Sequence, residues 1–250
     1  DQGRYNFSIM NYCENHLLYF HGVPNVCKGF PRRIWHSMVG NMPILNLRYE
    51  PLGKMENRIL KRIFDIALSG IFLVTVFPFV YLIVGSIIKF TSPGPILFKQ
   101  MRTGLNGVDF VCYKFRSMKV NAPDLRNVDG GTYNSANDSR VTKIGKFLRE
   151  TSLDEIPQIL NIIKGDMSII GPRAGDWESV DTYEDDEKDK AKVVPGLTGY
   201  CQAYFRNNAS VREKRLKDAW YANNVSFVLD VKIFFKTIET VLKHENLYTN

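Results

Sequence analysis

The sequence predicts an α+β protein that is predominantly helical and associated with a membrane. Three observations support this class. An uncharged apolar run covers Ile66–Ile88, helical patterns dominate after residue 140, and strand-like runs between residues 91 and 120 supply only a small β element. The chain has 250 residues and 44% hydrophobic content, which is enough for one sizeable core or two small ones.

Residues 1–57 are expected to form an N-terminal segment and linker ahead of a membrane-associated domain at 58–250. The segment contains aromatic residues and prolines without a strong period, and Asn41–Leu52 is typical of a short strand followed by a linker. The chain begins at Asp1 rather than Met and shows no signal-peptide pattern, which raises the alternative that it is a fragment of a longer protein.

The apolar run is expected to be a membrane helix at about residues 63–90. Its roughly 23 residues, at about 1.5 Å each, could cross a hydrocarbon core, and it lacks the polar stripe of a soluble helix. Pro78 near its middle should kink it. Basic residues flank both ends, as Arg58, Lys61 and Arg62 before it and Lys89, Lys99 and Arg102 after it. Because spanning helices concentrate basic residues on one side, these flanks narrowly favour a re-entrant helix.

The regions around this run are predicted from local patterns. A turn at 93–95 and a run over 108–118 indicate two short strands, and 121–140 is expected to be a loop. The charged segment 176–192 favours a solvated helix. The helical pattern at 226–244 carries apolar residues with lysines between them, which suits an amphipathic interfacial helix, although periodicity alone favours core packing.

Charge and cysteine content limit the function classes. The formal charge of +7 favours an anionic partner, which is a phospholipid surface, a nucleic acid or a phosphorylated small molecule. The four cysteines are scattered and form no C-x-x-C pair, which argues against zinc and redox motifs. A secreted disulfide framework is also unexpected in so long a chain, so the cysteines indicate a reducing, cytosol-facing compartment.

Asp154 and Glu155 stand side by side at the expected start of a helix, where a purely structural role explains them. Ser152 and Glu155 fit the S-x-x-E capping box, in which each side chain bonds the other residue's amide. Pro157 suits a first turn, and Lys164–Gly165 supplies a helix stop. Judged alone, the pair is better explained as a helix cap.

The surroundings of the pair favour chemistry on phosphate. An ionised aspartate can attack phosphorus as a nucleophile, and its neighbour can hold a divalent metal or transfer a proton. Paired carboxylates suit Mg²⁺, which typically also binds the substrate's phosphates. Arg149 precedes the pair, and Arg173 follows in Gly-Pro-Arg, where a tight turn would aim its guanidinium at an anion.

Several blocks in a fixed order resemble the bacterial sugar transferases, the monotopic phosphoglycosyl transferases, from about Arg58 to the C-terminus. They are KRIFD at 61–65, Pro78, YKFRSM at 113–118, SRVTKIGKFLRETSLDEIPQ at 139–158, KGDMSIIGPR at 164–173, VPGLTGYCQ at 194–202, Arg206–Asn207, and Asp218 ahead of WYANN. Any one block is weak evidence, but the ordered set is highly specific.

The resemblance implies transfer of a sugar 1-phosphate from a nucleotide diphosphate sugar, in the first instance a UDP-hexose, to undecaprenyl phosphate with release of UMP. It implies that Asp154 is the nucleophile of a covalent phosphosugar intermediate, that Glu155 assists it, and that Mg²⁺ is required, with the pair as tentative metal ligands. The membrane helix would be re-entrant. Substrate-binding positions implied in the same way are Lys114, Arg149, Arg173, Arg206 and Asp218.

The resemblance also implies a setting and leaves alternatives open. The reaction would be the first membrane step of exopolysaccharide, capsule or O-antigen synthesis, on the cytosolic face of the bacterial inner membrane, with membrane lipid and no nucleic acid as partners. The sugar and the oligomeric state, a homo-oligomer included, stay open. The rival readings are a non-catalytic membrane scaffold of a polysaccharide assembly complex and a soluble phosphohydrolase.

The sequence departs from the family pattern at three positions. Ala174 replaces the usual proline after Gly-Pro-Arg, Phe205 replaces a glycine before Arg206, and Phe77 precedes Pro78 where some members carry serine. The first two changes put the fit of the sugar or nucleotide in doubt, and the third puts the hydrogen bonding at the kink in doubt. Residues 1–57 resemble the tail of a nucleotide-fold-like domain found in larger members.

Overall fold

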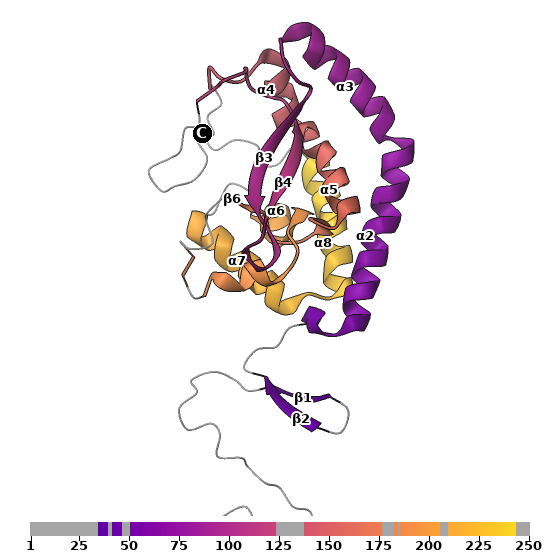
Figure 1. Ribbon diagram of the computed structural model, residues 1–250, viewed down its shortest axis with the longest axis vertical. Coiled ribbons are helices and arrows are strands. Elements are labelled where there is room, and N and C mark those ends of the chain that lie inside the picture. Colours follow the sequence, from indigo (N-terminus) through magenta and orange to yellow (C-terminus); the bar gives the residue numbers. More distant parts are fainter. Residues whose placement is uncertain are drawn as a thin grey trace, which may run out of the picture. The chain divides into compact units, whose positions relative to one another are not determined.

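The computed structural model describes residues 35–39, 42–46, 51–123, 138–176, 183–184, 186–205 and 210–243 (Figure 1). Contacts divide the chain into two units, Asp1–Tyr49 and Glu50–Asn250. This division falls before the predicted boundary at 57/58 because the 3₁₀ turn η2 (Pro51–Gly53) belongs with the helix that follows it. The Asn57 side chain donates to the Pro51 carbonyl at 2.8 Å.

The described part of the first unit is a two-stranded ribbon. Strand β1 (Trp35–Val39) pairs antiparallel with β2 (Met42–Asn46), with Trp35 opposite Asn46 and Val39 opposite Met42. The short strand predicted within 41–52 is therefore confirmed as β2.

The predicted membrane helix is two helices rather than one. Helix α2 (Met55–Thr75) and helix α3 (Phe77–Thr91) are bent by 56° at their break and follow each other as an arc in Figure 1. Pro78 lies in the first turn of α3, where its missing N–H costs nothing, and the chain bends just before it at Val76. The predicted kink is confirmed.

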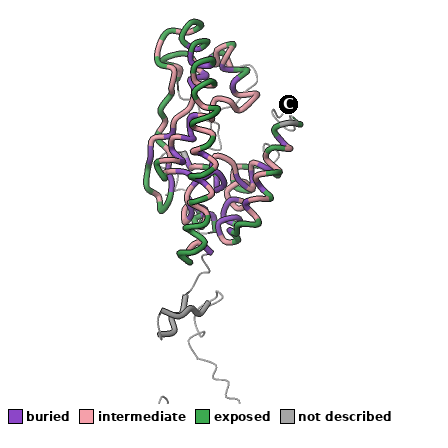
Figure 2. Tube along the Cα trace, turned by 90° about the vertical axis from the view of Figure 1, so that its right-hand side faces the viewer, coloured by how far each residue is buried: buried purple, intermediate pink, exposed green. Residues whose placement is uncertain are grey.

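The bent pair exposes a large apolar surface. Among the described residues no single helix is both long and apolar enough to cross a bilayer, whereas α2 and α3 pass that test together. Large apolar side chains on both helices are exposed, namely Ile59, Ile63, Ile71, Val74, Phe79, Leu82, Ile83 and Phe90. Figure 2 colours exposed residues green along the chain. An apolar surface of this extent is what the predicted membrane contact requires.

A small antiparallel sheet follows, in the order β4-β3-β6. Strand β3 (Leu97–Thr103) pairs along its length with β4 (Asp109–Phe115), and its end pairs with β6 (Gly175–Asp176). The 3₁₀ turn η3 (Leu105–Gly107) joins β3 to β4. Both strands predicted between residues 91 and 120 are confirmed.

One side chain forms hydrogen bonds with the backbone at the edge of β4 that faces away from β3. Fully buried Asn161 accepts from the Tyr113 amide at 3.1 Å and donates to the Val111 carbonyl at 2.6 Å. Its amide group also donates to Asp166 at 3.2 Å. Asn161 lies on helix α5 (Ile159–Lys164), so these bonds fix α5 against the sheet.

The segment around the acid pair joins a helix to a parallel strand pair. Helix α4 (Lys143–Glu150) is followed by the 3₁₀ helix η4 (Leu153–Gln158), by α5, and by β5 (Ser168–Ile170), which pairs parallel with β7 (Gly196–Thr198). Helix α5 ends at Lys164, and Gly165 follows with a φ of 101°, as the predicted stop requires.

The charged segment 176–192 is not the solvated helix that the sequence predicted, as far as it is described. Its helical part is only the 3₁₀ turn η6 (Lys188–Lys192), and two of its charged side chains are buried. Glu187 is bonded by Arg215 at 3.2 Å, and Lys190 lies 3.8 Å from Asp218. The prediction failed because ion pairs with helix α7 (Val211–Asn224) compensate the cost of burying these charges.

Three helices complete the second unit, namely α6 (Tyr200–Tyr204), α7 (Val211–Asn224) and α8 (Phe227–Leu242). The main core packs apolar residues of α5, β5, α7 and α8 together, including Ile162, Ile170, Tyr221 and Ile233. Helix α8 also exposes Phe227, Val228 and Phe235. Core packing alone therefore does not account for its apolar residues, and a predominantly helical α+β fold is confirmed.

Candidate active site

The acid pair lies in η4, and the predicted capping box does not form there. Ser152 has a φ of 58°, in the left-handed region, and its side chain makes no capping bond. Its amide donates instead to the Arg149 carbonyl at 3.2 Å. The carboxylate of Glu155 is turned toward β4, so the helix-cap explanation of this residue is wrong.

Two cations from separate elements meet at Glu155. The Lys114 ammonium, from β4, donates to Oε1 of Glu155 at 2.7 Å. The Arg173 guanidinium lies 3.4 Å from the same oxygen. Lys114 and Glu155 have side chains only 15% and 19% exposed, whereas Arg173 is 52% exposed. The Arg173 side chain is therefore accessible to an incoming anion.

These cations decide the charge of Glu155. Burial works against ionisation, but Lys114 and Arg173 outweigh it and hold the pKa of Glu155 low, at about 2. Glu155 is therefore a carboxylate throughout the physiological range and a poor proton donor. What it offers is a fixed negative charge beside Asp154.

Asp154 has the opposite character. Burial and the neighbouring Glu155 charge raise the pKa of Asp154 to about 6, although Lys114, Arg149 and Arg173 act to lower it. A carboxylate that is costly to keep ionised and lies close to three cations is poised to react with an electrophile.

Arg149 approaches the pair from the last turn of α4. Its Nε donates to the Ser117 hydroxyl at 3.0 Å, and its charge lowers the pKa of Asp154. Lys114, Arg149 and Arg173 are thus brought together around Asp154 and Glu155, and their role in substrate binding stays a prediction.

Asp218 is placed differently from the cations. It is buried in α7, where its carboxylate accepts from the backbone amide of Arg173 at 3.1 Å. Burial raises the pKa of Asp218 to about 6. Its observed contacts are with the main chain that carries Arg173 and with the Lys190 ammonium. Arg206, the remaining predicted substrate residue, lies outside the described residues.

Sequence reasoning did not include Arg102 in the site. Its charge contributes to the low pKa of Glu155. Phe98 pairs with Lys114 across the sheet, and Arg102 lies four residues from Phe98 on the same strand. Arg102 and Lys114 therefore share one face of the sheet. If the register of the two strands had been known, the alternation of side chains along each strand would have placed Arg102 on the same face as Lys114.

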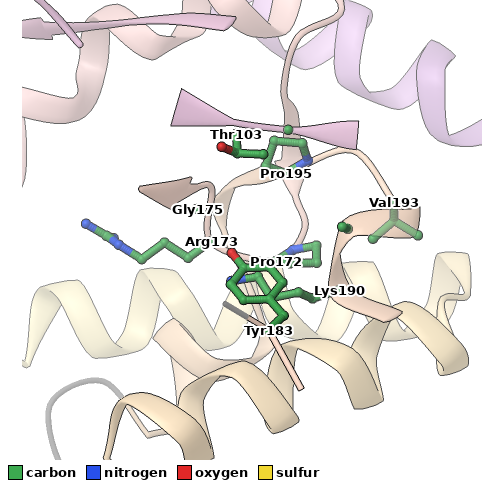
Figure 3. Close-up of a pocket in the computed structure, with 10 residues that line it drawn as sticks. Thr103, Pro172, Arg173, Gly175, Tyr183, Lys190, Val193 and Pro195 are labelled. Carbon is green, nitrogen blue, oxygen red and sulfur yellow. The ribbon is translucent and has the colours of Figure 1, made fainter. Parts of the chain in front are cut away.

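A hollow of about 230 Å³, partly open to solvent, adjoins Arg173. Thr103, Pro172, Tyr183 and Lys190 are among the residues that line it (Figure 3). In Figure 3 the Arg173 side chain extends away from the Tyr183 ring. Since its guanidinium reaches Glu155, Arg173 lies between this hollow and the acid pair.

The donor set around the pair fits a magnesium ion only together with a substrate. Within the described residues no group of three or more His, Cys, Asp or Glu side chains could hold a metal. Mg²⁺ is usually held by one or two carboxylates plus phosphate oxygens and water. Asp154 and Glu155 supply the two carboxylates, so a bound diphosphate would complete the set.

Comparison with known proteins places this arrangement in a family. Residues 56–244 match the family described as bacterial sugar transferase. The chain belongs to that family. The match begins at α2 and includes the acid pair and each cation around it, so the family region coincides with the second unit.

Relatives with assigned names share this region. The undecaprenyl-phosphate galactose phosphotransferase of Salmonella typhimurium is 35% identical over 85% of this chain and 47% of its own. The UDP-glucose:undecaprenyl-phosphate glucose-1-phosphate transferase of Escherichia coli is 38% identical over 86% of this chain and 47% of its own. The chain therefore spans about half the length of these relatives. EpsL of Bacillus subtilis, named as an uncharacterized sugar transferase, is 38% identical over 76% of this chain and 90% of its own.

Proposed function

We propose that this protein transfers a sugar 1-phosphate from a UDP-hexose to undecaprenyl phosphate and releases UMP. The observation that carries the proposal is the adjacent pair Asp154 and Glu155 with cations beside it, Lys114 at 2.7 Å and Arg173 at 3.4 Å from Glu155. The raised pKa of Asp154 and the lowered pKa of Glu155 agree with it. Relatives named for transfer of galactose or glucose phosphate to undecaprenyl phosphate support the substrate classes. The product would enter exopolysaccharide, capsule or O-antigen synthesis, and one relative is named for exopolysaccharide production.

In the first step an oxygen of Asp154 attacks the phosphorus that carries the sugar. The new O–P bond joins Asp154 to the sugar phosphate, and the bond to the second phosphate breaks, so that UMP leaves with the electron pair. Arg173 and Lys114 lie where negative charge develops, and each can shift from Glu155 to a phosphate oxygen as the diphosphate binds.

In the second step the acceptor regenerates the enzyme. An oxygen of undecaprenyl phosphate attacks the same phosphorus, the bond to Asp154 breaks, and its carboxylate returns. The leaving groups are a carboxylate and a phosphate monoester, so neither step needs a strong acid. This matches a Glu155 that stays ionised. Mg²⁺ held by Asp154 and Glu155 would neutralise diphosphate charge.

The proposed reaction needs access to a lipid phosphate from the cytosolic side of the inner membrane. The 56° bend of α2–α3 and the basic residues at both ends suit a helix pair that enters and leaves by the same face. We therefore expect cysteines placed at Arg58 and at Lys99 to be labelled from the same side in intact cells. Labelling from opposite sides would exclude the re-entrant topology.

The covalent intermediate provides the decisive test. Detergent-solubilised protein given a UDP-hexose without lipid acceptor should gain the mass of a sugar phosphate, on the peptide containing Asp154. Asp154→Asn should gain none and should release no UMP. A panel of UDP-sugars with undecaprenyl phosphate then identifies the donor. Absence of both adduct and UMP release across the panel would favour the non-catalytic scaffold.

A further inference from the structure

Three charged side chains on one turn of α2 point into the protein rather than toward lipid. Arg62 donates to the Ile162 and Ile163 carbonyls at the end of α5, at 2.7 and 3.0 Å. Asp65 accepts from the Ile169 amide at 2.9 Å and from the Ser168 hydroxyl at 3.0 Å. Together with Lys61 they bind backbone groups at both ends of the α5–β5 segment.

Lys61 makes the most extensive of these contacts. Its ammonium donates to the Ile170 carbonyl at 2.8 Å and to Asp230 of α8 at 2.7 Å. Tyr221 of α7 donates to Asp230 at 2.6 Å and to the Ile170 carbonyl at 3.3 Å. Lys61 and Asp230 have side chains only 11% and 4% exposed. Side chains of α2 and α7 thus reach the Ile170 carbonyl of β5, and Asp230 of α8 accepts from both of these side chains.

The backbone between Ile170 and Arg173 is held by hydrogen bonds, so it links the position of the Ile170 carbonyl to that of Arg173. The Gly171 amide donates to Thr198 of β7 at 2.9 Å, and the Pro172 carbonyl accepts from Gly196 at 2.8 Å. A side chain at Gly171 would collide with the backbone at Val194 and Gly196. Because this segment touches its neighbours at every residue, a shift of the Ile170 carbonyl moves Arg173.

We propose that Lys61 is a positioning residue for sugar-phosphate transfer, which fixes the Ile170 carbonyl and so holds Arg173 at the acid pair. The inference rests on the proposed function. It also gives the α2 cation a second role besides flanking the membrane helix. Because Lys61 lies on α2, the position of the membrane helix against the rest of the domain sets the geometry of the active site.

The test is a double-mutant cycle on full-length protein in detergent, read as the rate of phosphosugar adduct formation. Lys61→Met should lower that rate about tenfold in the wild-type background, but less than twofold in an Arg173→Ala background. Lys61→Arg, which keeps the cation, should recover most of the rate. Arg58→Met, which removes an exposed cation from the same helix, should be unchanged.

A second measurement does not depend on turnover. Amide hydrogen exchange in the peptide covering residues 170–175 should speed up in Lys61→Met, while the peptide covering 143–150 in α4 should not change. Because Lys61→Met removes the cation that pairs with the buried Asp230 carboxylate and destabilises the fold through that charge, Lys61→Met/Asp230→Asn is measured in parallel and should show the same pattern.

The outcomes separate the two proposals. Equal losses in both backgrounds, or unchanged exchange at 170–175, would show that Lys61 only stabilises the fold, and the transfer reaction would stand. A wild-type protein that forms no adduct would overturn the proposed function and, with it, the positioning role.

Discussion

Two stretches of this chain carry the same S-x-x-E pattern and use it in opposite ways. At the start of α7, Ser210 accepts from the Glu213 amide at 3.2 Å, and Glu213 accepts from the Ser210 amide at 2.7 Å. This is a complete capping box. At η4, Ser152 and Glu155 form none of these bonds.

The difference lies in what surrounds each glutamate. Glu213 is on the surface, where the nearest strong donors are the amide and hydroxyl of Ser210, and these bonds lower the pKa of Glu213. Glu155 faces Lys114, a full charge at 2.7 Å, which outcompetes an amide dipole. A local motif therefore determines local structure only where tertiary contacts offer nothing stronger.

The sharpest way to break this comparison is to neutralise each glutamate. Glu155→Gln removes the charge that would help to hold Mg²⁺ at the diphosphate, so turnover should fall by about 10²-fold. Glu213→Gln keeps a capping partner and should leave turnover within about twofold of wild type. UMP release from a UDP-hexose measures both. Equal activity of the two variants would place Glu155 outside the chemistry.

Arg173→Ala tests one of the cations that contact Glu155. Loss of one charge-assisted contact to a phosphate is worth about 1.5–3 kcal/mol, or roughly one to two decades in rate. The melting temperature should change little because the side chain is half exposed. Arg212→Ala, at an exposed cation near the α7 cap, is the control. Full activity in Arg173→Ala would contradict its assignment.

Lowering the pH provides a test of the acid pair that needs no mutation. The pKa of Asp154 is raised to about 6, so the nucleophile is lost as pH falls, and kcat/KM should drop about tenfold from pH 7 to pH 5. Stability responds in the opposite sense, since protonation relieves the cost of a buried charge at Asp154, so its contribution is lost as pH rises through 6. Thermal melts at each pH measure stability alongside kcat/KM. A kcat/KM that stays constant down to pH 5 would exclude Asp154 as the titrating nucleophile.

The smallest expected effect belongs to the intact cap. Ser210→Ala removes a side-chain acceptor from the first turn of α7 and should cost about 1 kcal/mol of unfolding free energy. The adduct-forming rate of the folded protein should stay unchanged. Chemical denaturation gives the first quantity and intact mass the second. A large loss of activity would mean that the α7 cap contributes to the site.

The sequence predicted what depends on local pattern. The bend at Pro78, the β3–β4 hairpin and the Gly165 stop each follow from a residue that restricts the backbone or from strand alternation. The family resemblance placed Lys114, Arg149 and Arg173 around the acid pair, although they come from three elements that no spacing rule connects.

The sequence could not predict which charged residues are buried, because their burial depends on the residues that they contact in the fold. Lys61 and Arg62 looked like flanks of a membrane helix, yet both donate to carbonyls far along the chain. Glu187 and Lys190 belong to a run typical of a solvated surface, yet both are buried. Long-range ion pairs reverse the expected burial of a charged residue, and a single sequence does not display them.

Asn161 has a consequence for how the molecule behaves in a crowded membrane. A bare edge strand invites another chain to add to the sheet, and such additions lead to aggregation. The Asn161 amide occupies the outward-facing groups of Tyr113 and Val111 as a neighbouring strand would. One side chain from α5 thus protects the β4 edge from self-association, and the same bonds fix the strand that carries Lys114.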